Sequence, residues 1–520
     1  MKLLLARAYG HLLVLGLLAW ALMSLLCGGL ANMLVMVMPK AEAALWSSLA
    51  GLPLVLLLGW YGISRRALKQ MHRYWGLLLL IFATVIWTSG TASYFRAELD
   101  TWSLPANAQL QLTAQSQREA GLDSAQLQTS TVAALPLVQQ HLSNYAAKAN
   151  TWYLQLPNAR TAFFTLNWQT SDHKMYQQLL DRSGQPLTLI SEVQWSEPPR
   201  ALGTWFFQLH YTLLGALGGA SRYIVALTAL LLLWLSFSGL RLWLQQRRYA
   251  RELGGKPQSA AASMSVANSA KWHIWTGLAA FPSLLLVSTS ALITMLWQLN
   301  PSPLDSLYGK QHGAFYSEVL PWFGGGHAAV GSAPVVDIKQ LLVKHADFSV
   351  GKIQVNQPGA VNSTVLFTQA AESQVSNQLA QVIYDRQGQI VQATAPNSIT
   401  AMQLRSFWYG LHQALFAEPR LRLCLAFASA LLVVMMWFGL RQWQSRNMLA
   451  WYWRAMLWTV LPGVPLVMLL MVAVLPWWPL ISRVSPELFP VQYLYHRQLL
   501  FGLVVCLLIN GLRFRRQSIR

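Results

Sequence analysis

The chain has 520 residues, of which 54% are hydrophobic and only 11% are charged, and its formal net charge is +20. Soluble proteins carry about 25% charged residues, so this composition excludes an ordinary soluble protein and indicates one that is embedded in a lipid bilayer. The excess positive charge lies in short segments, whereas the two long polar segments, 96–222 and 298–420, contain equal numbers of acids and bases. This distribution argues against a nucleic-acid partner.

Apolar runs that are long enough to cross a bilayer, which takes about 20 residues, recur along the chain. The last of them reaches this length only together with the aromatic stretch before it. Eight spans are therefore predicted, and they are Leu12–Met38, Ala43–Ile63, Tyr74–Phe95, Tyr223–Leu240, Trp272–Leu304, Leu423–Leu440, Ala455–Ser482 and Gln498–Leu512.

The basic residues of the short segments predict the topology. The segment Arg65–Arg73 has four basic residues and no acid, and Arg241–Lys271 has six basic residues and one acid. Such segments face the cytoplasm in membrane proteins. We therefore expect a multi-pass protein of the bacterial inner membrane, with both termini in the cytoplasm and both long polar segments in the periplasm.

A tandem repeat with an offset of about 200 residues organises the sequence. MHRYWGLLLL, with His72, matches KWHIWTGLAA, with His273, and FFQLHYTLLG, with His210, matches FWYGLHQALF, with His412. The second span of each copy ends in Gly-Leu-Arg. Each repeat therefore consists of a span, an outer domain of about a hundred residues and a second span.

The two long polar segments show the same order of predicted elements. A helical stretch (131–148 in the first, 335–345 in the second) precedes β-rich runs of alternating hydrophobicity, and a hairpin turn of the form Asp-Arg-x-Gly follows. A helix packed on a small antiparallel sheet is the expected structure of both. The predicted fold class is an integral membrane protein, an all-α transmembrane bundle of about eight helices in tandem repeat with two small α+β outer domains.

These elements predict nine segments. Residues 1–64 form two N-terminal helices, 246–271 a cytoplasmic linker, and 447–520 two C-terminal helices. The first repeat has spans at 65–96 and 208–245 around an outer domain at 97–207, and the second has spans at 272–298 and 409–446 around an outer domain at 299–408.

The topology brings the four repeat histidines together in two pairs. His72 and His273 open spans at the cytoplasmic face, and His210 and His412 open spans at the outer face. Two neutral imidazoles that face each other across helices are the axial ligands of six-coordinate haem iron. Two haems are thus predicted, one toward each face of an apolar layer about 30 Å thick. Histidines at a membrane boundary are also ordinary interfacial residues, and this alternative stays open.

Several residues near the histidines are candidates for contacts to a haem. Small residues would let a flat macrocycle approach the helices, or would serve close helix packing, and they are Gly76, Gly277, Gly215 and Gly218. Basic residues that would pair with haem propionates, or alternatively with lipid headgroups, are Arg73, Arg222 and Arg422.

Further histidines are candidates outside the repeat positions. His11 in the first span and His496 at the outer end of the last would supply a ligand if one of the four repeat histidines does not. His312 and His327 lie in the second outer domain and are weaker candidates for contact with substrate or metal, since loop histidines are usually solvated.

The motifs of the repeat resemble a known family. HRYWG before an apolar span, the Leu-His segments before the later spans and the Gly-Leu-Arg-x-Trp ends look like the PepSY-associated transmembrane helix family, from about Arg65 to Arg446. The segments with Asp-Arg-x-Gly hairpins resemble its PepSY-type domains. Members of this family include inner-membrane ferric-siderophore reductases that carry b-type haem on transmembrane histidines. The resemblance implies axial ligation by His72, His210, His273 and His412.

The second copy departs from the family pattern at one position. It reads WHIWTG where the first reads HRYWG, so Ile274 follows His273 where Arg73 follows His72. If that arginine contacts a propionate, the cytoplasmic haem site is asymmetric.

The leading hypothesis is a membrane oxidoreductase that transfers electrons through two haems and reduces a ferric siderophore on the periplasmic side. The oxygen ligands of a siderophore suit Fe(III), so one added electron weakens the iron–siderophore complex and releases the iron as Fe(II). The sequence has no nucleotide-binding or Cys-x-x-Cys motif, so the electron donor is a partner, either a cytoplasmic reductase or quinol. Two alternatives stay open, a non-redox carrier with a substrate path between its halves and a regulatory or assembly factor whose outer domains bind a peptide.

Overall fold

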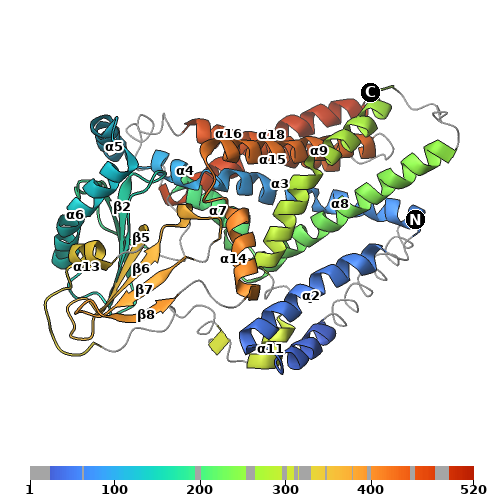
Figure 1. Ribbon diagram of the computed structural model, residues 1–520. Coiled ribbons are helices and arrows are strands. Elements are labelled where there is room, and N and C mark those ends of the chain that lie inside the picture. The colour runs from blue at the N-terminus through green and yellow to red at the C-terminus, as the bar shows by residue number, and fades with distance from the viewer. Residues whose placement is uncertain are drawn as a thin grey trace.

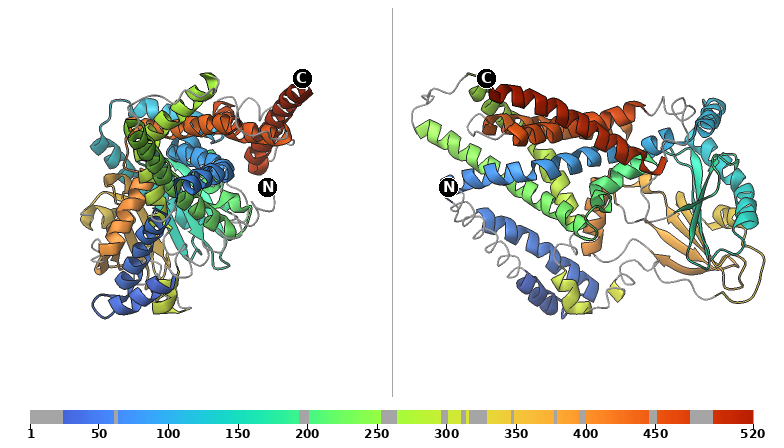
Figure 2. Two further views of the ribbon diagram at one scale, coloured as in Figure 1. Left: turned by 90° about the vertical axis from the view of Figure 1, so that its right-hand side faces the viewer. Right: turned by 180° about the vertical axis from the view of Figure 1, so that it is seen from behind.

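The computed structural model describes residues 24–60, 64–193, 201–252, 264–295, 301–309, 314–315, 329–345, 348–376, 379–394, 400–444, 451–474 and 491–519. Long helices form a bundle, and a β-sheet with its own covering helices lies at one end of it (Figures 1 and 2). We call this end of the bundle the sheet end and the opposite end the far end.

Six helices in the described part of the chain are long and apolar enough to cross a membrane. They coincide with six of the predicted spans and identify a multi-pass membrane protein. Helix α2 (Lys40–Trp60) covers most of the second predicted span, but the first is described only from Ser24, with an apolar helix at Ser24–Leu34, so the total of eight stays a prediction. The six helices are α3 (Arg65–Ser93), α8 (Ala220–Glu252), α9 (Met264–Thr294), α15 (Pro419–Gln444), α16 (Trp451–Val474) and α18 (Val491–Ile519).

The four spans of the two repeats form the centre of the bundle. Helix α3 contacts α8, α8 contacts α9, α9 contacts α15, and α15 contacts α3. Their common core contains Ala83, Trp87, Ala280, Leu284 and Leu432. Small residues such as the two alanines let neighbouring helices approach closely, which matters in a bilayer, where packing replaces the hydrophobic effect. The hairpin of α16 and α18 packs against α3, and α2 packs against α14 (Thr400–Gln413) and α11 (Ser302–Tyr308).

The two long polar segments build a single antiparallel sheet. Its strand order is β4-β3-β2-β1-β5-β6-β7-β8, with β1 of the first segment paired to β5 of the second. The antiparallel sheet was expected, but its continuity across the two repeats was not. Pairing of β1 with β5 satisfies backbone groups that would otherwise form an exposed edge. The strands are β1 (Thr151–Gln155), β2 (Phe163–Gln169), β3 (Met175–Asp181), β4 (Ser191–Val193), β5 (Val350–Asn356), β6 (Thr364–Gln369), β7 (Gln381–Tyr384) and β8 (Ile390–Thr394).

The sheet has one apolar and one polar face, because side chains alternate along each strand. The apolar face packs against α6 (Ser124–Tyr145) and α13 (Ile338–His345) and includes the buried Trp152, Phe164 and Phe367. The polar face is turned toward the helix bundle. Its side chains include Gln155, Asn167, Gln177, Lys352 and Gln354.

Both Asp-Arg-x-Gly segments form turns, as predicted. The backbone N–H of Gly184 donates to the carbonyl of Asp181 at 2.9 Å, and that of Gly388 donates to the carbonyl of Asp385 at 3.1 Å. Both glycines have a left-handed backbone, with φ of +87° and +77°, a conformation that glycine adopts without a steric penalty. The second turn joins β7 to β8 directly.

Short helices lie between the sheet and the second span of each repeat, where single long spans over 208–245 and 409–446 were expected. Helix α7 (Leu202–Thr212) ends before α8 begins at Ala220, and α14 ends before α15 begins at Pro419. Leu213, with φ of +49°, and Leu214, with φ of +56°, stop α7 because their backbone is left-handed. Helix α15 starts with a proline, which is favoured in the first turn of a helix.

Candidate functional site

The four repeat histidines lie in two pairs. The ring centres of His72 and His273 are 6.4 Å apart with the planes at 73°, and those of His210 and His412 are 5.8 Å apart with the planes at 25°. An imidazole nitrogen binds a metal at about 2 Å, so two imidazoles that share one metal ion have ring centres about 6 Å apart. Both pairs have this spacing.

The two pairs lie at opposite ends of α3. His72 is part of this helix, and His210 contacts its residues Ile86 and Gly90 near the sheet end. His72 and Gly90 are 18 residues apart, which corresponds to about 27 Å along a helix that rises about 1.5 Å per residue. This separation is close to the thickness of the apolar layer of a bilayer, about 30 Å.

One imidazole of each pair donates a hydrogen bond to a backbone carbonyl. Nδ1 of His210 lies 2.8 Å from the carbonyl oxygen of Ile86, and Nδ1 of His273 lies 2.9 Å from that of Met435. A carbonyl oxygen accepts only, so both Nδ1 atoms carry the proton.

The other imidazole of each pair contacts a serine. Nδ1 of His72 is 2.8 Å from Oγ of Ser238, and Nδ1 of His412 is 3.0 Å from Oγ of Ser290. Each hydroxyl donates its own hydrogen to a carbonyl of its helix at 2.9 Å, so its oxygen accepts from Nδ1. All four imidazoles are therefore protonated at Nδ1, which leaves the lone pair on Nε2 for a metal.

Glycines on neighbouring helices make room for three of the four imidazoles. A Cβ atom at Gly90 would lie 2.7 Å from two ring atoms of His210, one at Gly439 would lie 3.0 Å from His273, and one at Gly239 would lie 3.2 Å from His72. The sequence-based prediction did not include Gly90, Gly239 or Gly439. Gly239 and Gly439 occupy the same position in the two repeats, and this correspondence could have identified them. Of the glycines predicted from the sequence, Gly277 faces Met435, and no atom lies within 4 Å of a Cβ at Gly76, Gly215 or Gly218.

A cavity of about 1200 Å³ lies between the polar face of the sheet and the sheet end of the bundle. His210 and His412 line it, together with Gly90 and Trp87 of α3. Nε1 of Trp87 is buried and has no hydrogen-bond partner among the described residues. The cavity therefore connects the second histidine pair with a wall of polar side chains.

The family model described as the PepSY-associated TM region matches residues 69–446, which is most of the chain and includes all four repeat histidines. The chain belongs to the PepSY-associated TM family. This confirms the family that the sequence motifs indicated, while the ferric-siderophore reductase subtype stays a prediction. A comparison with curated proteins found no match.

In this PepSY-associated TM protein, polar contacts fix the two short helices that carry His210 and His412. Asp100 on α4 (Arg96–Trp102) accepts hydrogen bonds from the backbone N–H and the hydroxyl of Thr204 on α7, at 2.7 and 2.8 Å. Burial raises the pKa of Asp100. On α14, Nη2 of Arg405 donates to the carbonyl of Thr294 on α9 at 3.2 Å. Each repeat therefore has its own bond between a short helix and the rest of the fold.

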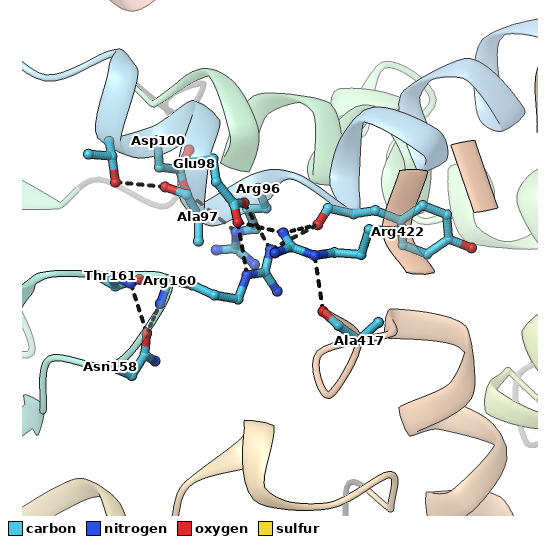
Figure 3. Close-up of polar contacts among 11 residues, drawn as sticks. Arg96, Ala97, Glu98, Asp100, Asn158, Arg160, Thr161, Ala417 and Arg422 are labelled. Carbon is cyan, nitrogen blue, oxygen red and sulfur yellow. Dashed lines mark hydrogen bonds and ion pairs between the residues drawn. The ribbon is translucent and has the colours of Figure 1, made fainter. Parts of the chain in front are cut away.

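A charged cluster ties the sheet to both repeats of the bundle (Figure 3). Glu98 on α4 accepts hydrogen bonds from Arg160, with Nη2 and Oε2 3.0 Å apart, and from Arg422 at the start of α15. Both guanidinium groups also donate to the carbonyl of Tyr94, and Nε of Arg422 donates to that of Ala417. The cluster thus joins α4, the loop before β2 and α15.

Glu98 is ionised in this cluster. Burial raises the pKa of its carboxyl group, but the hydrogen bonds from Arg160 and Arg422 outweigh burial and lower the pKa below its usual value. The turn that carries Arg160 is itself fixed, because Oδ1 of Asn158 accepts the backbone N–H groups of Arg160 and Thr161, both at 2.8 Å.

The remaining predicted residues lie in different surroundings. Arg422 is paired with Glu98, and the guanidinium of Arg222 lies 5.2 Å from the ring centre of Tyr211. Arg73 follows His72 at the far end and is half-buried. Their contacts to propionates stay predictions. His11, His312 and His327, and the side chain of His496, lie outside the described part of the structure.

Proposed function

We propose that the chain is a transmembrane electron-transfer protein that binds two b-type haems, one at each histidine pair, and reduces ferric siderophore iron from Fe(III) to Fe(II) at the sheet end. The observation that carries this proposal is the presence of two imidazole pairs with metal-sharing spacing at opposite ends of one four-helix core. Haem supplies a reversible one-electron change at its iron.

The residues at both pairs fit such a group. Every Nδ1 is engaged as a donor, so each Nε2 is available, and this second hydrogen bond is the usual support of a metal-bound histidine. Gly90, Gly239 and Gly439 seat three of the rings against neighbouring helices. At the sheet end, the unpartnered Nε1 of Trp87 offers a further donor beside the histidine pair.

An apolar core separates the two sites. Between them, the core of the four spans contains alanine and leucine side chains packed around Trp87. Such a core admits neither water nor ions, so charge crosses it as electrons. In this proposal the donor at the far end is a cytoplasmic reductase or a membrane quinol, and the sheet lies in the periplasm, as the basic short segments predict for a protein of the bacterial inner membrane.

The cavity at the sheet end is the proposed docking site for the ferric siderophore. Its volume of about 1200 Å³ exceeds the range of about 300–1,000 Å³ for small-molecule pockets, so a whole iron–chelator complex has room. One electron added to the iron leaves the chelator intact, and its hard oxygen ligands bind the resulting Fe(II) less tightly. The polar face of the sheet contacts the chelator, and His210 and His412 lie on the bundle side.

The first test is an optical difference spectrum, reduced minus oxidised, of the detergent-purified chain, with haem counted as the pyridine haemochrome. We expect a low-spin b-type spectrum and about two haems per chain, as two bis-histidine sites require. A colourless protein, produced with haem in ample supply, would overturn the proposal.

Single replacements then assign the sites. His72→Ala, His210→Ala, His273→Ala and His412→Ala should each remove about one haem. His141→Ala is the matched control, because His141 lies on α6 and bonds Gln178 of the sheet at 2.6 Å, and this variant should retain both haems.

A further inference from the structure

We infer that the sheet-end cavity selects chelates with a net negative charge and oxyanion arms of the carboxylate or catecholate type, and that Lys352 is the residue that recognises their charge. The identification of the ligand as an iron chelate rests on the proposed function. The preference for negative charge comes from the cavity itself.

Lys352 projects from the polar face of the sheet into the cavity. It lies on β5, where its neighbours across the ladder are Gln155 of β1 and Thr368 of β6, both neutral. Its side chain lines the cavity and keeps access to solvent, so it is only partly enclosed, and its ammonium group forms no ion pair with a carboxylate in the described part of the chain, although Glu372 lines the same cavity. The cavity thus contains a cation without a direct counter-charge.

The surroundings of Lys352 disfavour a positive charge. Burial lowers the pKa of its ammonium group, Arg96 lowers it further, and Glu372 offsets part of the effect. An uncompensated charge in a partly enclosed site is costly, and a bound anion would remove this cost. Lys352 on β5 and Arg96 on α4 both line the cavity. One bound ligand would therefore contact both basic side chains.

The other charged residues of the cavity largely cancel one another. Arg96 lies 3.7 Å from Asp100, and Arg160 is paired with Glu98. Glu192 lies on β4, four strands away from β5 in the sheet, which corresponds to about 19 Å at the usual strand spacing. Glu372 and Arg405 also line the cavity, so its lining carries four basic side chains (Arg96, Arg160, Lys352 and Arg405) against three acidic ones (Asp100, Glu192 and Glu372), and Lys352 is the basic residue at the middle of the sheet.

The rest of the wall suits a ligand rich in oxygen. Amide groups of Asn167, Gln177 and Gln354 line the cavity with the hydroxyl group of Thr165. A side-chain amide has two N–H donors, so Gln177 and Gln354, which each donate one bond to a neighbouring asparagine, keep a second donor for an oxyanion. Carboxylate and catecholate arms give ferric complexes with a net negative charge, whereas hydroxamate arms give neutral or cationic ones.

Gallium(III) complexes test the inference without electron transfer, because Ga(III) resembles Fe(III) in size and is not reduced. We would titrate the purified full-length chain with the gallium complex of a tris-catecholate and with that of a trihydroxamate bearing a free amine, and record tryptophan fluorescence. The anionic complex should bind at least about tenfold more tightly, and its affinity should fall as salt screens the charge. Equal affinities, or failure of both complexes to bind, would overturn the inference.

Variants at Lys352 locate the effect. Lys352→Gln should weaken binding of the anionic complex about ten- to a hundredfold, and Lys352→Arg should retain it. Lys339→Gln, an exposed site on α13 at the opposite face of the sheet, should change nothing. An unchanged affinity in Lys352→Gln refutes the role of this residue.

The two proposals fail separately. Charge selectivity in a chain without haem would leave the cavity assignment standing and overturn the proposed function. A chain with two haems that binds both gallium complexes equally would support the proposed function and overturn the charge selectivity of the cavity.

Discussion

The two histidine pairs share their contacts and differ in their surroundings. In each pair, one Nδ1 donates to a backbone carbonyl and the other to a serine hydroxyl. The far-end pair lies on the long helices α3 and α9, whereas the sheet-end pair lies on the short helices α7 and α14 and lines a large cavity. Under the proposed function, the first pair receives electrons and the second delivers them to a ligand.

The duplication has preserved the positions of the histidines but not all of the residues that contact them. At the far end, the repeat-related Gly239 and Gly439 each contact one histidine. At the sheet end, Gly90 contacts His210, but Ala291 occupies the matching position in the second repeat, and the neighbouring Ser290 contacts His412. The ligand positions are thus repeated, while their supports diverged, so each support gives a way to alter one pair and leave the other unchanged.

The largest effect is expected from Gly90→Ala. A Cβ atom at this position would lie 2.7 Å from two ring atoms of His210, closer than packed atoms approach, so the imidazole must leave its present position. The haem content should fall by about one per chain, with the far-end site intact. Pyridine haemochrome counts and the optical spectrum measure this directly.

Gly29→Ala is the control for that variant. It lies in the apolar helix Ser24–Leu34, which carries none of the four repeat histidines, and an added Cβ there meets no atom within 4 Å, so it should retain both haems. If Gly90→Ala also retains two haems with an unaltered spectrum, the support by Gly90 is refuted.

Local patterns predicted the spans and the histidine positions because both depend on short stretches of sequence. The apolar run of α3 and the positions of His72 and His210 relative to the spans were readable from composition and from the repeat. The pairing of β1 with β5 was not, because the alternation in each strand fixes its faces and leaves its neighbour undetermined. Two strands about 200 residues apart meet only when both repeats are folded.

The contacts that position the site were hidden for a related reason. Glu98 and Arg422 are 324 residues apart and carry no shared motif. The end of α7 depends on left-handed leucines at 213 and 214, and leucine has no preference for that conformation. Tertiary packing decides both features.

Smaller effects are expected at the serines. Ser290→Ala removes the hydroxyl that accepts from Nδ1 of His412 and leaves that imidazole only the backbone of Val287, and Ser238→Ala removes the acceptor for Nδ1 of His72. Loss of such a support typically weakens metal binding about 10- to 100-fold. Redox titration should therefore show a shifted midpoint potential and weaker haem retention at the sheet-end site in Ser290→Ala, and at the far-end site in Ser238→Ala.

Ser283→Ala serves as the control for the serine variants. Ser283 lies on α9 like Ser290, and its hydroxyl donates to the carbonyl of Ala280, so both midpoint potentials should stay unchanged. A shift of both sites by either serine variant would show that the pairs are not independently supported.

The smallest effect is expected from Glu98→Gln. The variant leaves Arg160 and Arg422 without their counter-charge and should loosen the sheet by about 1 kcal/mol, less than in a fully buried pair because the side chain of Glu98 is 28% exposed. Hydrogen exchange of the β1 and β5 amides should accelerate, while amides of α3 near His72 stay protected. Asp172→Asn, at an exposed pair with Lys174, should have no effect.

The contribution of Glu98 to the stability of the sheet should decrease as the pH falls. The pKa of Glu98 is lower in the folded protein than in the unfolded chain, so the ionised carboxylate stabilises the fold above its unfolded pKa of about 4.3. That stabilisation is lost as pH falls through the lower, folded value. Acidification below about pH 4.3 should therefore reduce the protection of β1 and β5 in the wild type, after correction for intrinsic exchange, and the difference from Glu98→Gln should shrink. A difference that stays constant with pH would mean that the hydrogen bonds of Glu98, and not its charge, hold the sheet on the bundle.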